Sequence, residues 1–207
     1  MKCNPDVSVI ITNYNYEKYI ARAVRSCLNQ SHVSHEVIVV DDISTDDSIK
    51  VLKPFEEQIK VVSTDTNSGV AVAANVGVKH SRGQFFIRVD ADDYVNKDMC
   101  YMMKTYLEAN HDAFCVSCDY LMVDNFENTL ERKYAEQDNI SCGIMYRRDP
   151  FVQAGGYNGK MRHREEEELR KRLGQEYKIH HLRIPFYRYR MHNTNKTKEP
   201  EYKTWEI

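Results

Sequence analysis

Short apolar runs alternate with segments of helical periodicity through the first half of the chain. The apolar runs are rich in Val, Ile and Phe and have the length of strands buried on both faces, at residues 7–12, 36–41, 59–62 and 85–89. Between them, apolar residues recur at helical spacing across residues 17–28, 49–55 and 70–80. Strands that alternate with helices predict an α/β fold with right-handed βαβ units and a mainly parallel sheet flanked by helices.

The pattern is less regular beyond residue 95. Helical segments are predicted at residues 96–109 and 165–173, and extended segments at 113–123, 140–146 and 179–191. The polar tail after Thr194 is predicted to be poorly ordered. No internal repeat or low-complexity linker divides the chain. We therefore predict one domain over residues 1–207, made of a regular half, residues 1–95, and a less regular half, residues 96–207, with a smaller extension on the side of the second half.

The composition is that of an ordinary globular protein. Hydrophobic residues make up 42% of the chain and charged residues 29%, and the formal net charge is −2, so no basic field indicates nucleic-acid binding. No apolar run is long enough to cross a bilayer, and the first residues lack the apolar core of a signal peptide. The expected compartment is the cytoplasm, including the inner face of the membrane, with peripheral membrane contact at most.

Six cysteines without a secretion signal argue against a disulfide framework. Cys115 and Cys118 have the spacing of a metal-binding pair, but a structural zinc site needs two further ligands at similar spacing, and the sequence has no second pair. In an extended segment, residues three apart face opposite sides of the strand. We therefore predict reduced thiols at these two positions.

Polar residues follow the strands of the predicted sheet. Residues 12–14 (Thr-Asn-Tyr) follow the first strand, the pair at 41–42 (Asp-Asp) ends the second, and the cluster at 90–93 (Asp-Ala-Asp-Asp) ends the fourth. Open α/β sheets bind ligands outside the carboxyl ends of their strands. The sequence therefore predicts that these three polar sets converge on one edge of the sheet.

The acidic cluster at residues 90–93 allows two interpretations. Adjacent carboxylates repel one another unless a positive charge lies between them, and a hard divalent cation with oxygen ligands can supply that charge while it also bridges the phosphates of a substrate. Alternatively, the cluster is a solvated loop that caps the helix after it. The cluster taken alone leaves both interpretations open.

Four motifs in this order resemble those of the family 2 glycosyltransferases, which have the GT-A fold. They are VSVIITNYN at residues 7–15, VVDDISTD at 39–46, NSG with AANVG at 67–77, and DADD at 90–93. Each motif is weakly specific, but four at the expected places in a βαβ scheme are specific together. The resemblance covers roughly the whole chain and is strongest in its first half.

The resemblance implies an inverting, metal-dependent transfer of a sugar from a nucleotide-diphosphate sugar to a glycan or lipid-linked acceptor, as in surface polysaccharide synthesis. It implies a divalent metal, manganese or magnesium, as cofactor. It also implies that residues 1–95 bind the nucleotide sugar and residues 96–207 bind the acceptor.

The resemblance assigns residues to the donor site. Thr12 and Tyr14 would line the base and ribose pocket, and Asp42 would accept a hydrogen bond from the imide N–H of uracil, a donor that cytosine lacks. This points to a UDP-sugar, although Asp42 could instead place a negative charge at the N-terminus of the next helix. The expected nucleotide-binding residues are Thr12, Asn13, Tyr14, Asp42, Asn67, Asn75, Asp90, Ala91 and Asp92, and the expected metal ligands are Asp92, Asp93 and His192.

The late segment around His192 is the source of the third metal candidate. Similar segments in the family place a histidine near the metal or the diphosphate, and neutral imidazole can bind manganese. A surface histidine is the alternative. The neighbouring Arg188 and Arg190 could contact a phosphate or an anionic acceptor, or could simply flank a strand.

The chain departs from the family pattern at the third motif. The family often carries an arginine just before the asparagine of that motif, and here the position is Ala74. Arg88, two residues before Asp90, could restore a positive charge near the acids. Its alternative role is a simple ion pair with Asp90 or Asp92.

The catalytic base is also assigned by resemblance. In the family a glycine pair is followed by an acidic dipeptide whose second residue deprotonates the acceptor hydroxyl, and by register Glu166 takes that position with Glu165 in support. The alternative is a solvated helix face, because acidic residues precede basic residues by four in this segment. Those spacings are Glu166 with Arg170, Glu167 with Lys171, and Glu168 with Arg172.

Two other function classes fit parts of the pattern. A nucleotidyltransferase also needs acidic metal ligands, but it would carry a basic loop after the first strand, where residues 12–15 are uncharged. A sugar-nucleotide-binding protein with a degenerate active site is consistent with Ala74 and Glu166. The sequence specifies neither the sugar, the acceptor, the linkage nor the oligomeric state.

Overall fold

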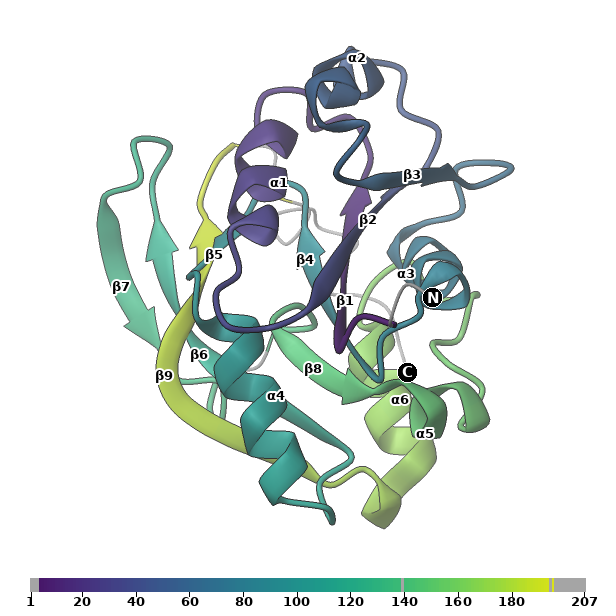
Figure 1. Ribbon diagram of the computed structural model, residues 1–207, viewed down its shortest axis with the longest axis vertical. Coiled ribbons are helices and arrows are strands. Elements are labelled where there is room, and N and C mark those ends of the chain that lie inside the picture. Colours follow the sequence, from purple (N-terminus) through teal and green to yellow (C-terminus); the bar gives the residue numbers. More distant parts are fainter. Residues whose placement is uncertain (1–3, 139, 194, 196–207) are drawn as a thin grey trace.

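The chain folds around one mixed β-sheet (Figure 1). The computed structural model describes residues 4–138, 140–193 and 195. Within them the sheet has nine strands in the order β3-β2-β1-β4-β8-β6-β9-β5, and β7 pairs with β6. The strands are β1 Val7–Asn13, β2 His35–Asp41, β3 Lys60–Ser63, β4 Phe85–Asp90, β5 Tyr94–Val95, β6 Cys115–Val123, β7 Thr129–Lys133, β8 Ile144–Arg147 and β9 Ile179–Arg190.

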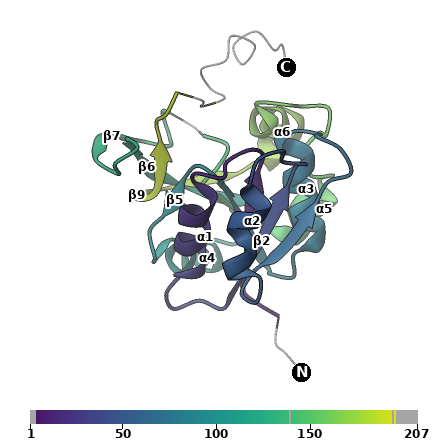
Figure 2. The ribbon, with the colours of Figure 1, turned by 90° about the horizontal axis from the view of Figure 1, so that it is seen from above.

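Helices cover both faces of the sheet (Figures 1 and 2). The α-helices are α1 Ile20–Leu28, α2 Ser48–Leu52, α3 Val70–His80, α4 Met99–Ala109, α5 Arg148–Gln153 and α6 Glu165–Leu173, and the 3₁₀ helices are η1 Lys53–Phe55 and η2 Gly174–Glu176. One core lies between the sheet and α1, α2 and α4, and the other between the sheet and α3, α5 and α6. Side chains along β1 point alternately to the two faces of the sheet, so Val9 and Ile11 pack in the first core and Ile10 packs in the second.

The predicted parallel sheet is confirmed for the first half of the chain. Strands β3, β2, β1 and β4 are neighbours and all run parallel. Beyond β4 the sheet becomes mixed, because β8 is antiparallel to both β4 and β6 while β9 runs parallel to β6. The α/β fold class is thus confirmed, with the less regular second half completing the same sheet.

Three short elements were not predicted from the sequence. Strand β5 has two residues and pairs with β9, so it depends on a partner that lies about ninety residues later in the chain. Strand β7 is almost entirely exposed and has no apolar alternation to reveal it. Helix α5 has six residues, fewer than a periodic pattern needs to be recognised.

The described cysteines are free thiols in the two cores. Cys115 is buried in one core and Cys118 in the other, so the prediction that they face opposite sides of the strand is confirmed. Burial raises the pKa of the Cys118 thiol to about 12. Cys3 lies outside the described residues, as does the polar tail after Thr194 apart from Asn195. None of the described helices has the length and apolarity needed to cross a membrane.

Candidate active site

The ends of β1, β2 and β4 meet at one edge of the sheet. Asn13 is in register with Asp41, and Thr12 with Asp90, so the polar residues after each strand are brought together as the parallel topology requires. A cavity of about 570 Å³ opens at this edge. That volume is within the range of small-molecule and cofactor sites, roughly 300–1,000 Å³.

Most of the site residues expected from the sequence line this cavity. They are Thr12, Asn13, Tyr14, Asp42, Asp90, Asp92, Asp93, Glu165 and Glu166. Four of the expected residues are not among the lining residues: Asn67, Asn75, Ala91 and His192. The structure therefore collects residues from both halves of the chain around one space.

Asn75 holds two loops together. Its amide nitrogen donates to the carbonyl of Tyr157 at 2.7 Å, and its Oδ1 accepts from the Tyr157 N–H at 3.0 Å. Gly156, at φ +68°, lies against it, and a Cβ there would come within 2.8 Å of the Asn75 Oδ1. Asn75 thus anchors the glycine turn onto α3, which explains both the asparagine and the second glycine without a ligand.

The Asp42 carboxylate organises the loop that enters α3. Its Oδ1 accepts from the Thr64 hydroxyl at 2.7 Å and the Ser68 N–H at 2.9 Å, and its Oδ2 accepts from the Gly69 N–H at 2.8 Å. Asn67 donates to the backbone carbonyl of Asp42 at 3.3 Å. A negative charge at a helix N-terminus is favourable, and the helix it serves is α3 rather than the one directly after β2.

The carboxylates of the acidic cluster differ in their surroundings. Asp90 is the most accessible, with 31% of its side chain exposed, and its Oδ1 lies 3.3 Å from the Thr12 hydroxyl that donates to it. The Oδ2 of Asp92 is 2.9 Å from the Nε2 of His192. Asp90 and Asp92 therefore present carboxylate oxygens at the cavity wall, with imidazole next to the second.

Asp93 is held more tightly. Its Oδ2 accepts from the Tyr187 hydroxyl and its Oδ1 from the Arg190 N–H, both at 2.8 Å. Burial raises the pKa of the Asp93 carboxyl well above its usual value, and the charges of Asp92 and Asp90 raise it further. Asp93 is thus the least available of the three carboxylates to a ligand.

His192 is a buried residue, not a surface one. It is 4% exposed, stacks on the ring of Tyr19 at 4.8 Å and meets the edge of Tyr16 at 6.0 Å. Its backbone N–H donates to Asn195 Oδ1 at 2.6 Å. The ring is therefore fixed beside Asp92, with its Nε2 2.9 Å from that carboxylate.

The donor atoms around the cluster fit an oxygen-preferring divalent cation. Ligand atoms of Asp90, Asp93 and Cys142 lie within 4.8 Å of one another. Burial raises the pKa of the Cys142 thiol well above its usual value, which keeps it protonated, and thiol sulfur suits softer metals than manganese or magnesium. Carboxylate oxygens suit the harder ions, so Asp90 and Asp92 are the better first candidates.

The first two glutamates of α6 are buried rather than solvated. Glu166 is 1% exposed, and its Oε1 accepts from the Tyr177 hydroxyl at 2.9 Å and from Arg170 at 2.8 Å. Two of the expected pairs four residues apart, Glu166 with Arg170 and Glu168 with Arg172, are present. Glu167 forms an ion pair with Arg164. Glu165, also buried, points toward Arg88.

Arg88 links the acidic cluster to α6. This buried guanidinium lies 3.1 Å from Asp90 Oδ1 and also forms an ion pair with Glu165. Burial by itself lowers the pKa of Arg88, but the Asp90 and Glu165 carboxylates raise it well above its usual value, so the guanidinium stays charged. The ion pair with Asp90 is the one foreseen as an alternative, and the second pair with Glu165 joins two segments 77 residues apart.

Arg88→Gln is expected to lower the free energy of unfolding by ~3–5 kcal/mol, because it leaves the Glu165 carboxylate buried without its cation. Urea unfolding followed by circular dichroism measures this. The control is Arg183→Gln, which breaks an exposed ion pair with Glu136 and should cost at most ~1 kcal/mol. Equal losses in the two variants would contradict the role of Arg88.

Two residues hold the cluster in a way that the sequence did not predict. The Tyr187 hydroxyl accepts from the Asp90 N–H at 3.1 Å while it donates to Asp93. Arg190, considered from the sequence only as a phosphate contact or a strand flank, is 3% exposed and faces the acidic loop. Both residues belong to β9, and their contacts with the cluster become apparent only from the position of that strand next to it.

Comparison with known proteins gives one consistent family. The family model described as Glycosyl transferase family 2 matches residues 8–198. The chain is 35% identical over 121 residues to an uncharacterized glycosyltransferase of Haemophilus influenzae, covering 54% of this chain and 48% of that protein. It is 36% identical over 109 residues to the poly(ribitol-phosphate) beta-N-acetylglucosaminyltransferase TarS of Staphylococcus aureus, covering 50% of this chain and 19% of TarS. The chain thus spans less than half the length of these relatives.

Solved structures share the fold. A TarS fragment, residues 1–349, in complex with UDP-GlcNAc superposes with a TM-score of 0.78 at 22% identity, over 92% of this chain and 60% of that one. The mannosyltransferase PcManGT of Pyrobaculum calidifontis, in complex with GDP-Man and Mn2+, has a TM-score of 0.72 at 19% identity, over 90% of this chain and 57% of that one. At these identities the likeness establishes the fold alone.

Proposed function

Because this chain belongs to glycosyl transferase family 2, we propose that it moves a sugar from a UDP-sugar to a hydroxyl of a glycan or lipid-linked acceptor, with inversion, in the synthesis of a surface polysaccharide. The observation that carries the proposal is one cavity lined both by the acidic cluster and by the buried carboxylates of α6. Such a cavity can hold a donor diphosphate next to a base.

The donor side is supported by the chemistry of Asp42. A carboxylate offers about four lone-pair positions, and three hydrogen bonds from its own loop occupy part of this capacity. Asp42 lines the cavity, so the remaining capacity on Oδ2 suits the imide N–H of uracil. The UDP-GlcNAc complex of the TarS fragment, a protein of the same fold, is in keeping with a UDP-sugar donor.

We propose Asp90 and Asp92 as the groups that hold a divalent cation, manganese or magnesium, with His192 as a further ligand and Asp93 in support. A bound cation would neutralise charge on the leaving diphosphate. The manganese in the PcManGT complex, on the same fold, is in keeping with this choice. Arg88, beside Asp90, would add a fixed positive charge at the same wall of the cavity.

Glu166 is the proposed base. The acceptor oxygen attacks the anomeric carbon, the bond from that carbon to the diphosphate oxygen breaks, and the hydroxyl proton passes to the Glu166 carboxylate. Tyr177 and Arg170 hold its Oε1, which orients the group before the acceptor arrives. Glu165, paired with Arg88, would position the start of α6 rather than exchange a proton.

We propose that the two halves of the chain bind different substrates. Residues 1–95 would carry the donor contacts and residues 96–207 the base and the acceptor contacts. The second half contributes Tyr120, Met122 and Tyr189 to the same cavity, and these apolar and aromatic groups could receive a sugar ring. The proposed place of action is the cytoplasm, including the inner face of the membrane, where a lipid-linked acceptor can be reached.

The proposal is tested by a thermal-shift panel of nucleotide diphosphates and nucleotide sugars with and without Mn2+. A ligand present at about 100 times its Kd stabilises the folded state by roughly 2.7 kcal/mol, so UDP-sugars with Mn2+ should raise the melting temperature clearly. CDP should raise it less, because cytosine has no imide N–H for Asp42. Absence of any stabilisation by UDP- or dTDP-sugars would refute the donor assignment.

A further inference from the structure

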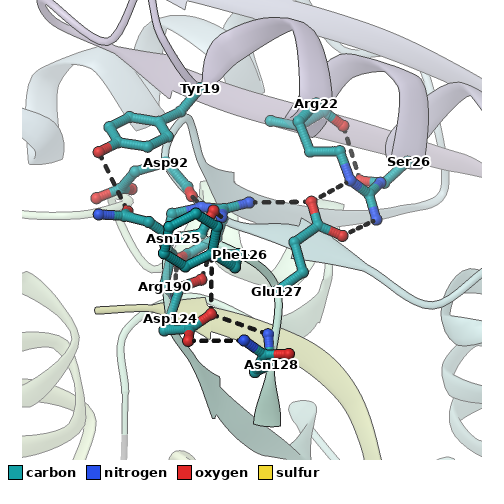
Figure 3. Close-up of polar contacts among 12 residues, drawn as sticks. Tyr19, Arg22, Ser26, Asp92, Asp124, Asn125, Phe126, Glu127, Asn128 and Arg190 are labelled. Carbon is teal, nitrogen blue, oxygen red and sulfur yellow. Dashed lines mark hydrogen bonds and ion pairs between the residues drawn. The ribbon is translucent and has the colours of Figure 1, made fainter. Parts of the chain in front are cut away.

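The turn between β6 and β7 is hydrogen-bonded to itself and strained. Asp124 Oδ1 accepts from the N–H groups of Phe126 at 2.8 Å and Asn128 at 2.9 Å, which closes the turn (Figure 3). Glu127 has a φ of +65°, in the left-handed region that side chains other than glycine seldom adopt. Such a conformation persists where surrounding contacts hold it, and it often marks a functional constraint.

The contacts that hold Glu127 come from two arginines (Figure 3). Arg22 of α1 binds the carboxylate with both Nε, at 2.8 Å, and Nη2, at 3.1 Å. Arg190 of β9 reaches the same Oε1 with its Nη2 at 3.3 Å. The hydrogen bond from Arg22 is the main reason that the pKa of Glu127 is lowered despite partial burial, so the carboxylate is charged between two guanidinium groups.

Arg190 connects Glu127 to the acidic cluster. Its Nε donates to the backbone carbonyl of Asp92 at 3.0 Å, and its own backbone N–H donates to Asp93 Oδ1 at 2.8 Å. Its Nη1 lies 3.3 Å from the carbonyl of Asp124 and 3.4 Å from that of Asn125. The planar guanidinium has five N–H donors in a fixed fork, which is what contacts in three directions require.

We propose that residues 124–128, together with Arg22 and Arg190, form a clamp that positions the metal-binding loop. This rests on the proposed function. Within the clamp, Arg190 fixes the backbone of Asp92 and the side chain of Asp93, while His192, two residues further along, is brought to 2.9 Å from Asp92. Glu127 and Arg22 touch none of the proposed ligands and act through Arg190, so they are positioning residues.

The geometry explains why a surface turn would matter to a buried loop. Groups behind metal ligands orient them, and loss of such a group typically costs roughly 10–100-fold in metal affinity. Glu127 supplies the charge that keeps the Arg190 guanidinium in place, and Arg22 supplies the charge that keeps Glu127 in place. Both side chains are more than a third exposed, so the fold itself does not depend on their burial.

The test uses Glu127→Gln in the intact chain, with Glu136→Gln as the matched control. Glu136 lies on the same part of the chain and pairs with Arg183, and none of the contacts described for it involves the clamp. Two quantities are measured: amide hydrogen exchange of residues 91–95 without ligand, and the Kd for Mn2+ in the presence of UDP. Glu127→Gln should speed the exchange about 10-fold and weaken Mn2+ binding about 10-fold, and the control should change neither.

A double-mutant cycle separates positioning from general loss of structure. Because Arg22 acts through Glu127, Arg22→Gln combined with Glu127→Gln should weaken Mn2+ binding no more than Glu127→Gln alone. Additive losses, or unchanged exchange of residues 91–95 in Glu127→Gln, would overturn the clamp. Faster exchange with unaltered Mn2+ affinity would overturn its link to the metal. If the wild-type chain bound neither Mn2+ nor UDP, the proposed function would fail, and the exchange measurement would still decide whether the clamp holds the loop.

Discussion

Asp92→Asn is expected to weaken Mn2+ binding in the presence of UDP by at least about 100-fold and to abolish sugar transfer. Asp92 lines the cavity, is nearly buried, and sets its Oδ2 beside His192 at 2.9 Å. Asparagine keeps the shape and one oxygen but removes the negative charge that a divalent cation needs. Titration of free Mn2+ by electron paramagnetic resonance, with transfer measured in parallel, gives both quantities.

The control for this substitution is Asp149→Asn. Asp149 is 80% exposed along its side chain and pairs only with the neighbouring Arg148 among the contacts the structure describes. Its replacement removes the same charge from a residue that does not line the cavity, so any effect of net charge on Mn2+ binding appears in both variants. Equal metal dependence of transfer in wild type and Asp92→Asn would mean that the acidic cluster is structural.

Glu166→Gln is expected to lower the turnover number by about 10²–10⁴-fold, the usual contribution of a general base. The affinity for UDP with Mn2+ should stay within about twofold of wild type, because Glu166 lies on the side of the cavity formed by α6 and the predicted nucleotide contacts come from other elements. Glutamine can still accept a hydrogen bond from the Tyr177 hydroxyl, and it has nearly the same size as glutamate. Steady-state kinetics and a separate binding titration distinguish the two effects.

The chain offers a matched control on the same helix. Glu168 pairs with Arg172 at 2.9 Å as Glu166 pairs with Arg170, four residues apart in both cases. Glu168 is not among the residues that line the cavity. Glu168→Gln should therefore leave turnover within about twofold of wild type. Similar turnover in both variants would mean that Glu166 is not the base. It would favour the alternative interpretation, in which the acidic residues of α6 only form ion pairs with basic residues four positions later.

The regular half of the fold was predictable because its signal is local. Buried parallel strands have apolar runs, helices have a repeat near 3.6 residues, and both can be recognised within about a dozen residues. Helices α3 and α6 begin and end where the pattern predicted. The short, exposed or partner-dependent elements β5, β7 and α5 lack such a signal, because their stability depends on contacts made after the sheet has formed.

The candidate site divides in the same way. Parallel topology alone brings Thr12, Asp42 and Asp90 to one edge, since the carboxyl ends of neighbouring parallel strands lie together. It does not say what each side chain contacts. Asn75 belongs to a motif of the expected nucleotide site, yet it pairs with the backbone of Tyr157, 82 residues away.

By itself, the sequence determined the α/β fold class, the edge of the sheet at which the polar residues gather, and the family. Each rests on periodicity or on residue order along the chain. Only the tertiary structure decided that Arg88 joins Asp90 to Glu165 and that Arg190 holds the backbone of the acidic cluster. These contacts span 77 and 98 residues, and they exist because α6 and β9 return to the cluster after the sheet has closed. No local period encodes that return, since it is set by how the two cores pack.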